Sequence, residues 1–168
     1  MSELYELPEL VAGFLRERGV AAKAMFCGEP WRTGREPVVA VSLGRIQIER
    51  MGLGDYLGLR FDWDSGREME VYARKAKVRL ELEVFAGKDL GEAALRSGCR
   101  TVEQAVTGEE LFGFSVSSLE QGGTEFYEKL ELFCCKISLE LEGHLQGVLD
   151  TESGEFSGFE IVARMGGT

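Results

Sequence analysis

The chain is organised around residues 74–106, which read RKAKVRLELEVFAGKDLGEAALRSGCRTVEQAV. From Lys75 to Val84 charged and apolar residues alternate without a break, and this is the period of a strand with one buried face. Asp89 can cap a following helix, with Glu92 three residues later. Small and apolar residues then recur at helical spacing: Ala94, Leu95, Gly98, Cys99, Val102 and Val106. The stretch predicts a half-buried strand followed by a helix that lies close to a sheet.

A second helix is expected near the N-terminus, at residues 4–18, with Gly19 as its C-terminal stop. One helical face is marked by Leu4, Leu7, Leu10, Val11, Phe14 and Leu15. With the helix at 90–106, this predicts an α+β fold. We expect a mixed or antiparallel sheet of four to six strands with the two helices packed on it.

The other expected strands are residues 20–26, 38–49 and 111–119, and a long strand from Phe133 to Leu145. Within residues 38–49 the apolar face follows odd positions before Gly44 and even positions after it. This change at a glycine indicates a bulge or bend. The glycine pair in residues 121–123 predicts a turn before the long strand. Along that strand the odd positions from Cys135 to Leu141 should face inward.

The length of 168 residues, 44% of them hydrophobic, predicts a single domain spanning residues 1–168. Residues 140–162 read as an extra C-terminal hairpin that ends in a short edge strand. Residues 166–168 should be disordered.

Residues 51–73 alternate glycines with large apolar side chains, and they predict a protruding arm or hairpin that feeds into the central strand. Such an arm cannot easily bury its apolar side chains within its own domain, so a partner subunit is the expected acceptor. The alternative is an ordinary loop folded over its own sheet. The expected interface residues are Leu53, Tyr56, Leu57, Leu59, Phe61, Trp63 and Tyr72.

The net charge of −10 is concentrated in residues 108–168, which hold 12 Asp and Glu against 3 Lys and Arg. This balance opposes tight nucleic-acid binding, which needs clustered Lys and Arg. A solvated acidic face is the simpler explanation. No run approaches the roughly 18 apolar residues of a membrane span, and the first residues are acidic, unlike those of a signal peptide. We therefore expect a cytoplasmic protein.

Two turns resemble the start of a calcium loop, Asp62-x-Asp64-x-Gly66 and Asp150-x-Glu152-x-Gly154. Both lack the further carboxylates that such a loop requires. Because Asp, Ser and Gly are also the residues of tight turns, we interpret both as hairpin turns.

The residues that could carry chemistry form no recognisable set. Cys27, Cys99, Cys134 and Cys135 have no CxxC spacing and are expected to act as small apolar side chains. His144 is the single histidine and has no nucleophile motif beside it. We therefore predict no catalytic residue, no metal and no cofactor, and a protein that is not an enzyme.

Four segments resemble the tail-terminator and tail-completion proteins of long-tailed bacteriophages and prophages. They are LPELV at residues 7–11, PVVAVSL at 37–43, GDYLG at 54–58 and the pair Phe126-Tyr127. The resemblance implies a structural protein without enzymatic activity that forms a ring, commonly a hexamer, and joins the tail tube to the head. Its implied partners are its own copies and tail tube or neck proteins, and its implied location is the cytoplasm and then the virion tail.

The hairpin at residues 140–162 departs from that family pattern. Two alternatives stay open: a small soluble binding module and an uncharacterised enzyme. If the protein forms such a ring, the arm and an exposed strand edge should join the subunits. The acidic C-terminal third should then lie near the lumen or the rim of the ring.

Overall fold

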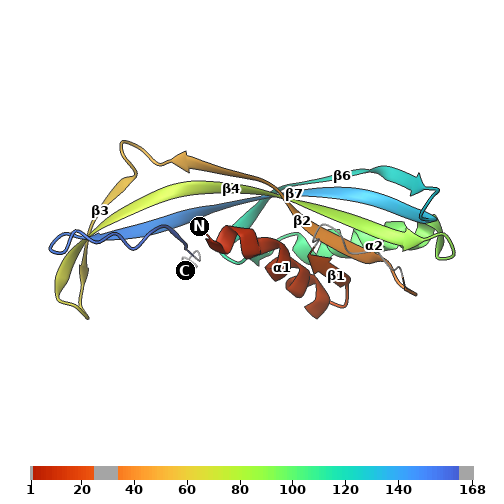
Figure 1. Ribbon diagram of the computed structural model, residues 1–168, viewed down its shortest axis with the longest axis horizontal. Coiled ribbons are helices and arrows are strands. Elements are labelled where there is room, and N and C mark those ends of the chain that lie inside the picture. Colours follow the sequence, from red (N-terminus) through yellow and green to blue (C-terminus); the bar gives the residue numbers. More distant parts are fainter. Residues whose placement is uncertain (1, 25–33, 163–168) are drawn as a thin grey trace.

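The computed structural model describes residues 2–24 and 34–162. Figure 1 shows an elongated molecule in which long strands run from end to end and both helices lie below the sheet. The elements in chain order are α1 (Ser2–Glu17), β1 (Ala21–Ala24), β2 (Val38–Arg50), β3 (Tyr56–Asp62), β4 (Arg67–Gly87), α2 (Gly91–Val106), β5 (Glu110–Leu111), β6 (Phe114–Tyr127), β7 (Leu132–Asp150) and β8 (Glu160–Ile161).

One mixed sheet contains all the described strands, in the order β1-β2-β4-β7-β6-β5, with β3 added beside β4 and β8 beside β7. Only β1 and β2 pair in parallel; every other described pair is antiparallel. The α+β class is confirmed, but the expected number of four to six strands is wrong because the sheet has eight. The extra strand β5 has two residues and is too short to produce a periodic pattern, whereas β8 lies in the short edge strand expected at the end of residues 140–162.

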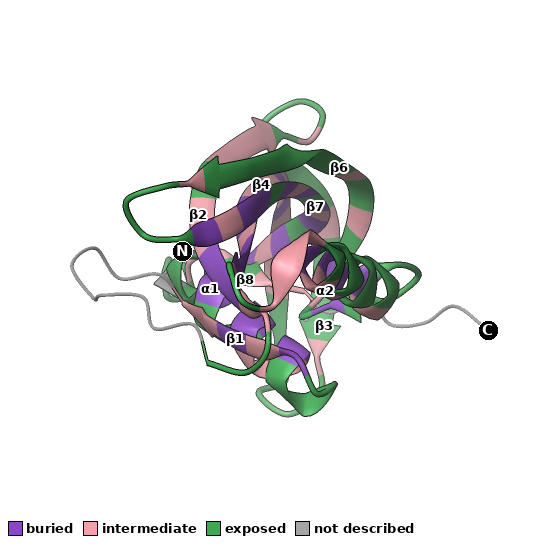
Figure 2. Ribbon diagram, turned by 90° about the vertical axis from the view of Figure 1, so that its right-hand side faces the viewer, coloured by how far each residue is buried: buried purple, intermediate pink, exposed green. Residues whose placement is uncertain are grey.

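The sheet is built on β4 and β7, which pair without a register shift from Met69↔Asp150 to Gly87↔Leu132. They contain 21 and 19 residues. At about 3.3 Å per residue each strand is roughly 60–70 Å long. Strands of this length accumulate a large twist, and the view along the long axis shows the sheet curled around itself (Figure 2).

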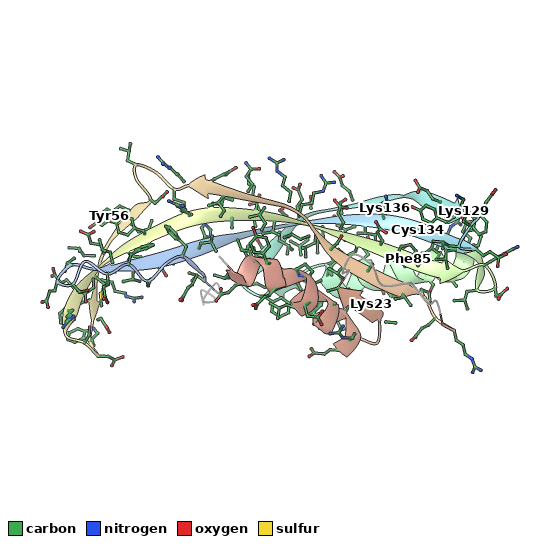
Figure 3. All side chains as sticks on the ribbon, in the orientation of Figure 1. Lys23, Tyr56, Phe85, Lys129, Cys134 and Lys136 are labelled. Atoms are coloured by element: carbon green, nitrogen blue, oxygen red, sulfur yellow. The ribbon has the colours of Figure 1, made fainter. Side chains whose placement is uncertain are left out.

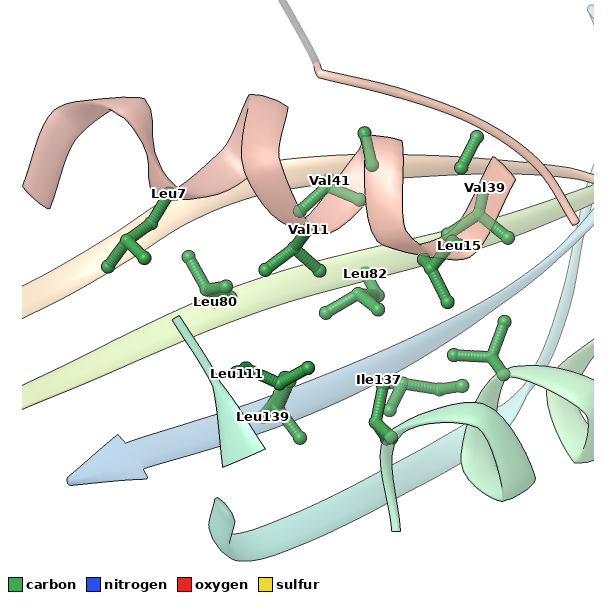
Figure 4. Close-up of a cluster of buried hydrophobic side chains, with 14 of the residues drawn as sticks. Leu7, Val11, Leu15, Val39, Val41, Leu80, Leu82, Leu111, Ile137 and Leu139 are labelled. Atoms are coloured by element: carbon green, nitrogen blue, oxygen red, sulfur yellow. The ribbon is translucent and has the colours of Figure 1, made fainter. Parts of the chain in front are cut away.

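The main core lies between the sheet and the two helices, which cover the same face. Figure 4 shows Leu7 and Val11 of α1 directed at Val41, Leu80 and Leu82 of β2 and β4. The same cluster includes the buried stripe of α2: Leu95, Cys99, Val102 and Val106. The alternation expected along β4 and β7 is therefore confirmed.

Glycines explain how both helices fit. Gly19 has φ +80°; its N–H donates to Arg16 O and the next N–H, of Val20, donates to Leu15 O, which closes α1 as expected. A Cβ added at Gly98 of α2 would lie 3.0 Å from Pro37, so only a small residue permits this close approach.

The expected cap of α2 by Asp89 is wrong. The helix begins at Gly91, and its N-cap residue, Leu90, makes no side-chain cap bond.

Bulges shape two strands. The register shift between Leu43 and Arg45 confirms the bulge at Gly44. The turn predicted at residues 121–123 is wrong, since β6 continues to Tyr127 and the shift between Gln121 and Thr124 is a bulge within it. Glycines favour bulges as well as turns, so their presence alone did not decide between them. The chain turns instead at residues 128–131.

The sheet face away from the helices is polar over most of its length. Lys75 Nζ lies 2.8 Å from Glu142 Oε2, and Lys77 Nζ lies 3.2 Å from Glu49 Oε1. A small apolar cluster of Ala40, Phe85, Leu132 and Cys134 covers one end of this face, near the β6–β7 turn. Figure 3 labels Phe85 and Cys134 there, far from Tyr56 at the other end of the long strands.

Three predictions concern segments that lie outside the described residues. They are the end of the expected strand at residues 20–26, the setting of Cys27, and the disorder of residues 166–168.

Candidate interaction site on the arm

The arm, defined here as residues 51–74 and 145–161, is the part of the sheet that extends beyond the helices. It forms the left end of the molecule in Figure 1. β3 pairs with the first half of β4 from Asp62↔Arg67 to Tyr56↔Tyr72, with a bulge between Tyr56 and Gly58. Residues 145–150 of β7, together with β8, complete the arm. β3 and β4 therefore form a hairpin within this region.

The seven side chains expected to form an interface all lie on this arm. Tyr72 is half-buried, and the other six are exposed: Leu53 100%, Tyr56 47%, Leu57 55%, Leu59 59%, Phe61 45% and Trp63 86%. A stretch with this much exposed apolar surface is unusual for a monomer.

Most of these side chains share the sheet face that the helices cover elsewhere. Even-numbered residues of β4, such as Ala76 and Val78, point into the main core, so Tyr72 lies on the same face. Cross-strand pairing places Tyr56 opposite Tyr72 and Leu59 opposite Glu70, on that face as well. The same face therefore continues from the body onto the arm, where Glu68, Glu70 and Arg74 interrupt its apolar side chains and no described helix covers it.

A row of aromatic rings runs across the arm. Tyr56, Tyr72, Phe156 and Phe159 contact in succession, with ring centroids 5.7, 6.1 and 5.2 Å apart. Phe156 lies directly over Gly147, where an added Cβ would come within 2.4 Å of the ring. The sequence indicated Phe156 and Phe159 only as parts of an edge strand, because the pairing that brings them to Tyr72 joins residues far apart in the chain.

A pocket of about 360 Å³ opens where the arm joins the body. We call it the arm-root pocket. Its wall includes one ion pair, in which Arg74 Nε donates to Asp55 Oδ2 at 2.8 Å. Asp55 is only 5% exposed, and the Arg74 hydrogen bond is the main reason that the pKa of its carboxyl lies below the ordinary value. The lining residues are Gly54, Asp55, Tyr72, Arg74, Leu149, Phe156 and Phe159.

Asp55 fixes the entry to the arm through its backbone too. Its φ of +64° is uncommon for a residue other than glycine. Its carbonyl accepts the N–H of Ala73 at 2.8 Å, and Oδ1 accepts the N–H of Met51 at 3.2 Å. The loop before β3 is therefore anchored to the central strand.

A second set of contacts fastens the far end of the arm. Arg67 lies 2.9 Å from Asp150 Oδ2 and 3.4 Å from Glu152 Oε2. Thr151 Oγ1 donates to Glu68 O at 3.0 Å. The N–H groups of Glu152 and Ser153, followed by Arg67, lower the pKa of Asp150 to about 2. The arm is thus cross-braced between β4 and β7 as well as paired along β3 and β8.

The two calcium-like segments are turns. Asp62 accepts hydrogen bonds from Ser65 Oγ at 2.7 Å and Asp64 N at 3.2 Å, and its carbonyl accepts Gly66 N. Asp150 makes the equivalent bonds with Glu152 N and Gly154 N. Across residues 2–24 and 34–162, no group of three or more His, Cys, Asp or Glu side chains is arranged to hold a metal.

The other candidates for chemistry lie away from the arm pocket. His144 is exposed on β7, and its carbonyl accepts the N–H of Val162 at 3.0 Å. Cys134 and Cys135 are buried on opposite faces of the sheet, as expected, and Cys99 is buried on α2. Desolvation is the main reason that the pKa of Cys99 rises to about 12 and that of Cys134 to about 11. Thiols in this state are poor nucleophiles at neutral pH.

Neither described helix combines the length and the apolar composition needed to cross a membrane. Comparison of the sequence with protein-family models and with curated proteins finds no match.

Proposed function

We propose that this protein is a structural subunit that assembles with copies of itself, of the tail-terminator or tail-completion type found in bacteriophages and prophages. The observation that carries the proposal is the exposed apolar surface of the arm, which includes Leu57, Leu59 and Trp63. The segmental resemblance of the sequence supplies the phage context.

The energetics of the arm favour a protein partner. Covering one large apolar side chain stabilises a complex by about 1.5–3 kcal/mol before ordering costs are subtracted. The ordering cost is small here because Asp55, Arg67 and Asp150 already brace the arm. A preorganised apolar surface is suited to permanent assembly, where it stays covered.

A neighbouring subunit can also offer strand edges. β5 pairs with Phe114 and Ser115, and among the described strands none pairs with that edge of β6 from Val116 onward. Two bulges interrupt the register of β6, and bulges disfavour long regular pairing at an edge. We therefore propose that side-chain contacts of the arm, more than strand addition, hold the subunits together.

In the proposed ring, the part of the acidic C-terminal third that lies outside the arm, residues 108–144, faces the lumen or the rim. It contributes β5, β6, most of β7 and the turn between β6 and β7, and it holds 8 Asp and Glu against 2 Lys and Arg. A negative lumen would repel passing DNA and keep it from adhering.

A monomeric binding module is the second candidate, and the arm-root pocket favours it. It is an open depression of about 360 Å³ that combines aromatic side chains with one ion pair. A binding module of this kind should stay monomeric and should bind one ligand per chain at saturation.

The proposal is tested by negative-stain electron microscopy of the purified protein, alone and mixed with the tail-tube protein encoded nearest to its gene. Closed rings are expected. Genes for a portal, tube or tape-measure protein beside this gene would support the phage role. Dispersed single particles under both conditions, together with a gene neighbourhood of metabolic enzymes, would reject it.

A further inference from the structure

We infer that Trp63 of one subunit inserts into the arm-root pocket of a second copy of this chain. The inference rests on the proposed self-assembly and names the two surfaces that meet.

Trp63 has the properties of an anchor. It is 86% exposed at the end of β3, and its ring contacts Phe61 edge-on, with centroids 4.9 Å apart. The turn that carries it is fixed by the hydrogen bonds from Ser65 and Asp64 to Asp62. A rigid, exposed tryptophan loses little conformational entropy on binding, and tryptophan is enriched among residues that dominate interface energy.

The chemistry of the pocket matches an indole. Tyr72, Phe156 and Phe159 supply ring edges and faces, and Leu149 adds an aliphatic wall. Asp55 is almost fully buried and both its oxygens already accept hydrogen bonds, so the polar wall is the Arg74 guanidinium, which can lie against an aromatic ring. A site that is mostly apolar with one polar wall is what a tryptophan side chain requires.

Trp63 cannot fill the pocket of its own chain. The pairs Asp62↔Arg67 and Tyr56↔Tyr72 set the turn and the pocket five residues apart along β4. At about 3.3 Å per residue this is a separation of roughly 16 Å along a paired strand. A Trp63 side chain in this pocket would therefore belong to a second molecule.

Charge selects a second copy as that molecule. Asp62 and Asp64 flank Trp63. At the pocket Asp55 neutralises Arg74, and Arg50, which is the cross-strand partner of Arg74, leaves one positive charge in excess. The acidic tip of one arm thus complements the basic rim of another. Opposite charges at an interface rim speed association and fix orientation.

Fluorescence tests the inference directly. The chain has two tryptophans, so a Trp31→Phe background leaves Trp63 as the only emitter. Emission and light-scattering mass are measured on the same samples over a range of protein concentrations. As mass rises, the emission of Trp63 is expected to move to shorter wavelength because the indole leaves water.

Two pocket variants and one control sharpen the test. Leu149→Arg and, separately, Phe156→Ala should raise the concentration at half-assembly by at least about tenfold and abolish the emission shift. Leu130→Ser removes an exposed leucine at the opposite end of the molecule and should change neither measurement. Circular dichroism establishes that each variant is folded.

The outcomes separate the inference from the proposed function. A rise in mass with unchanged emission rejects the pocket contact and leaves self-assembly standing. An emission shift in a particle that stops at two copies supports the pocket contact and rejects the ring. Constant mass at every concentration rejects both.

Discussion

Arg74 Nε donates a 2.8 Å hydrogen bond to Asp55 Oδ2, and this bond ties the loop before β3 to the long central strand. The same aspartate accepts the backbone N–H groups of Met51 and Ala73. One residue therefore sets the position from which the whole arm projects.

The first prediction concerns this bond. Asp55→Asn should lower the midpoint of thermal unfolding, because the amide keeps the side-chain shape and tolerates the positive φ but loses the charge that Arg74 meets. Amide hydrogen exchange should speed up in residues 51–56 and stay unchanged in β7. The matched control Asp89→Asn changes a carboxylate that caps nothing and should have no effect. Equal exchange in both variants would show that the ion pair does not hold the loop.

The second prediction tests the alternation along β4. Leu82 is fully buried in the main core, so Leu82→Ala should lower the free energy of unfolding by about 2–5 kcal/mol. The adjacent Glu83 lies on the other face, and Glu83→Ala should change it by no more than about 0.5 kcal/mol. Urea denaturation measures both. Similar losses from the two substitutions would contradict the assignment of faces.

The third prediction compares two glycines of β7. An alanine Cβ would lie 2.6 Å from the ring of Phe114 at Gly143, and 2.4 Å from the ring of Phe156 at Gly147. Phe114 is fully buried and cannot move away, so Gly143→Ala should cost about 1–3 kcal/mol of stability. Phe156 is 45% exposed and can swing outward. Gly147→Ala should therefore cost less stability and instead disturb the arm-root pocket, which a larger loss of assembly than of stability would reveal.

The fourth prediction is a pH dependence. Hydrogen bonds from Glu152 N and Ser153 N, followed by the bond from Arg67, lower the pKa of Asp150 from 3.8 to about 2. A carboxyl whose pKa is lower in the folded state stabilises the fold above pH 3.8, and this contribution disappears as the pH falls through about 2.

Asp150→Asn should therefore reduce the urea midpoint at pH 7, and the deficit should shrink between pH 4 and pH 2. Asp64→Asn, in the other turn of the arm, is the matched control and should follow the wild type. A deficit that stays constant across this pH range would show that ionisation of Asp150 does not brace the arm.

The sequence predicted the parts of the fold that depend on local periodicity. Both helices, the Gly44 bulge and the inward positions of β7 follow from repeats of 3.6 and 2 residues, and the structure confirms them. The prediction from sequence misplaced the β6–β7 turn, because the glycines at positions 122 and 123 suit a bulge equally well. It gave the wrong cap for α2 because a possible side-chain acceptor does not ensure that the bond forms.

For the arm, too, the sequence predicted local features but not contacts between distant residues. Its hairpin and its exposed side chains were predictable from the run of glycines and apolar residues after Arg50. The arm-root pocket was not, because it requires Tyr72 and Phe156 to meet through the pairing of β4 with β7. Contacts of this range depend on strand register, which a single sequence does not specify.

The central claim is that the arm is the surface of self-assembly, and mass in solution tests it most directly. The arm variant combines Leu57→Thr, Leu59→Thr and Phe61→Thr, which keep strand propensity and remove apolar surface. The control variant combines Tyr5→Gln and Leu130→Ser, which remove comparably exposed side chains from the other parts of the molecule.

Light scattering over a range of concentrations should give a closed oligomer for the wild type and the control, and a monomer of 18.6 kDa for the arm variant. A wild type that stays at 18.6 kDa throughout, or an arm variant that assembles like the wild type, would contradict the account.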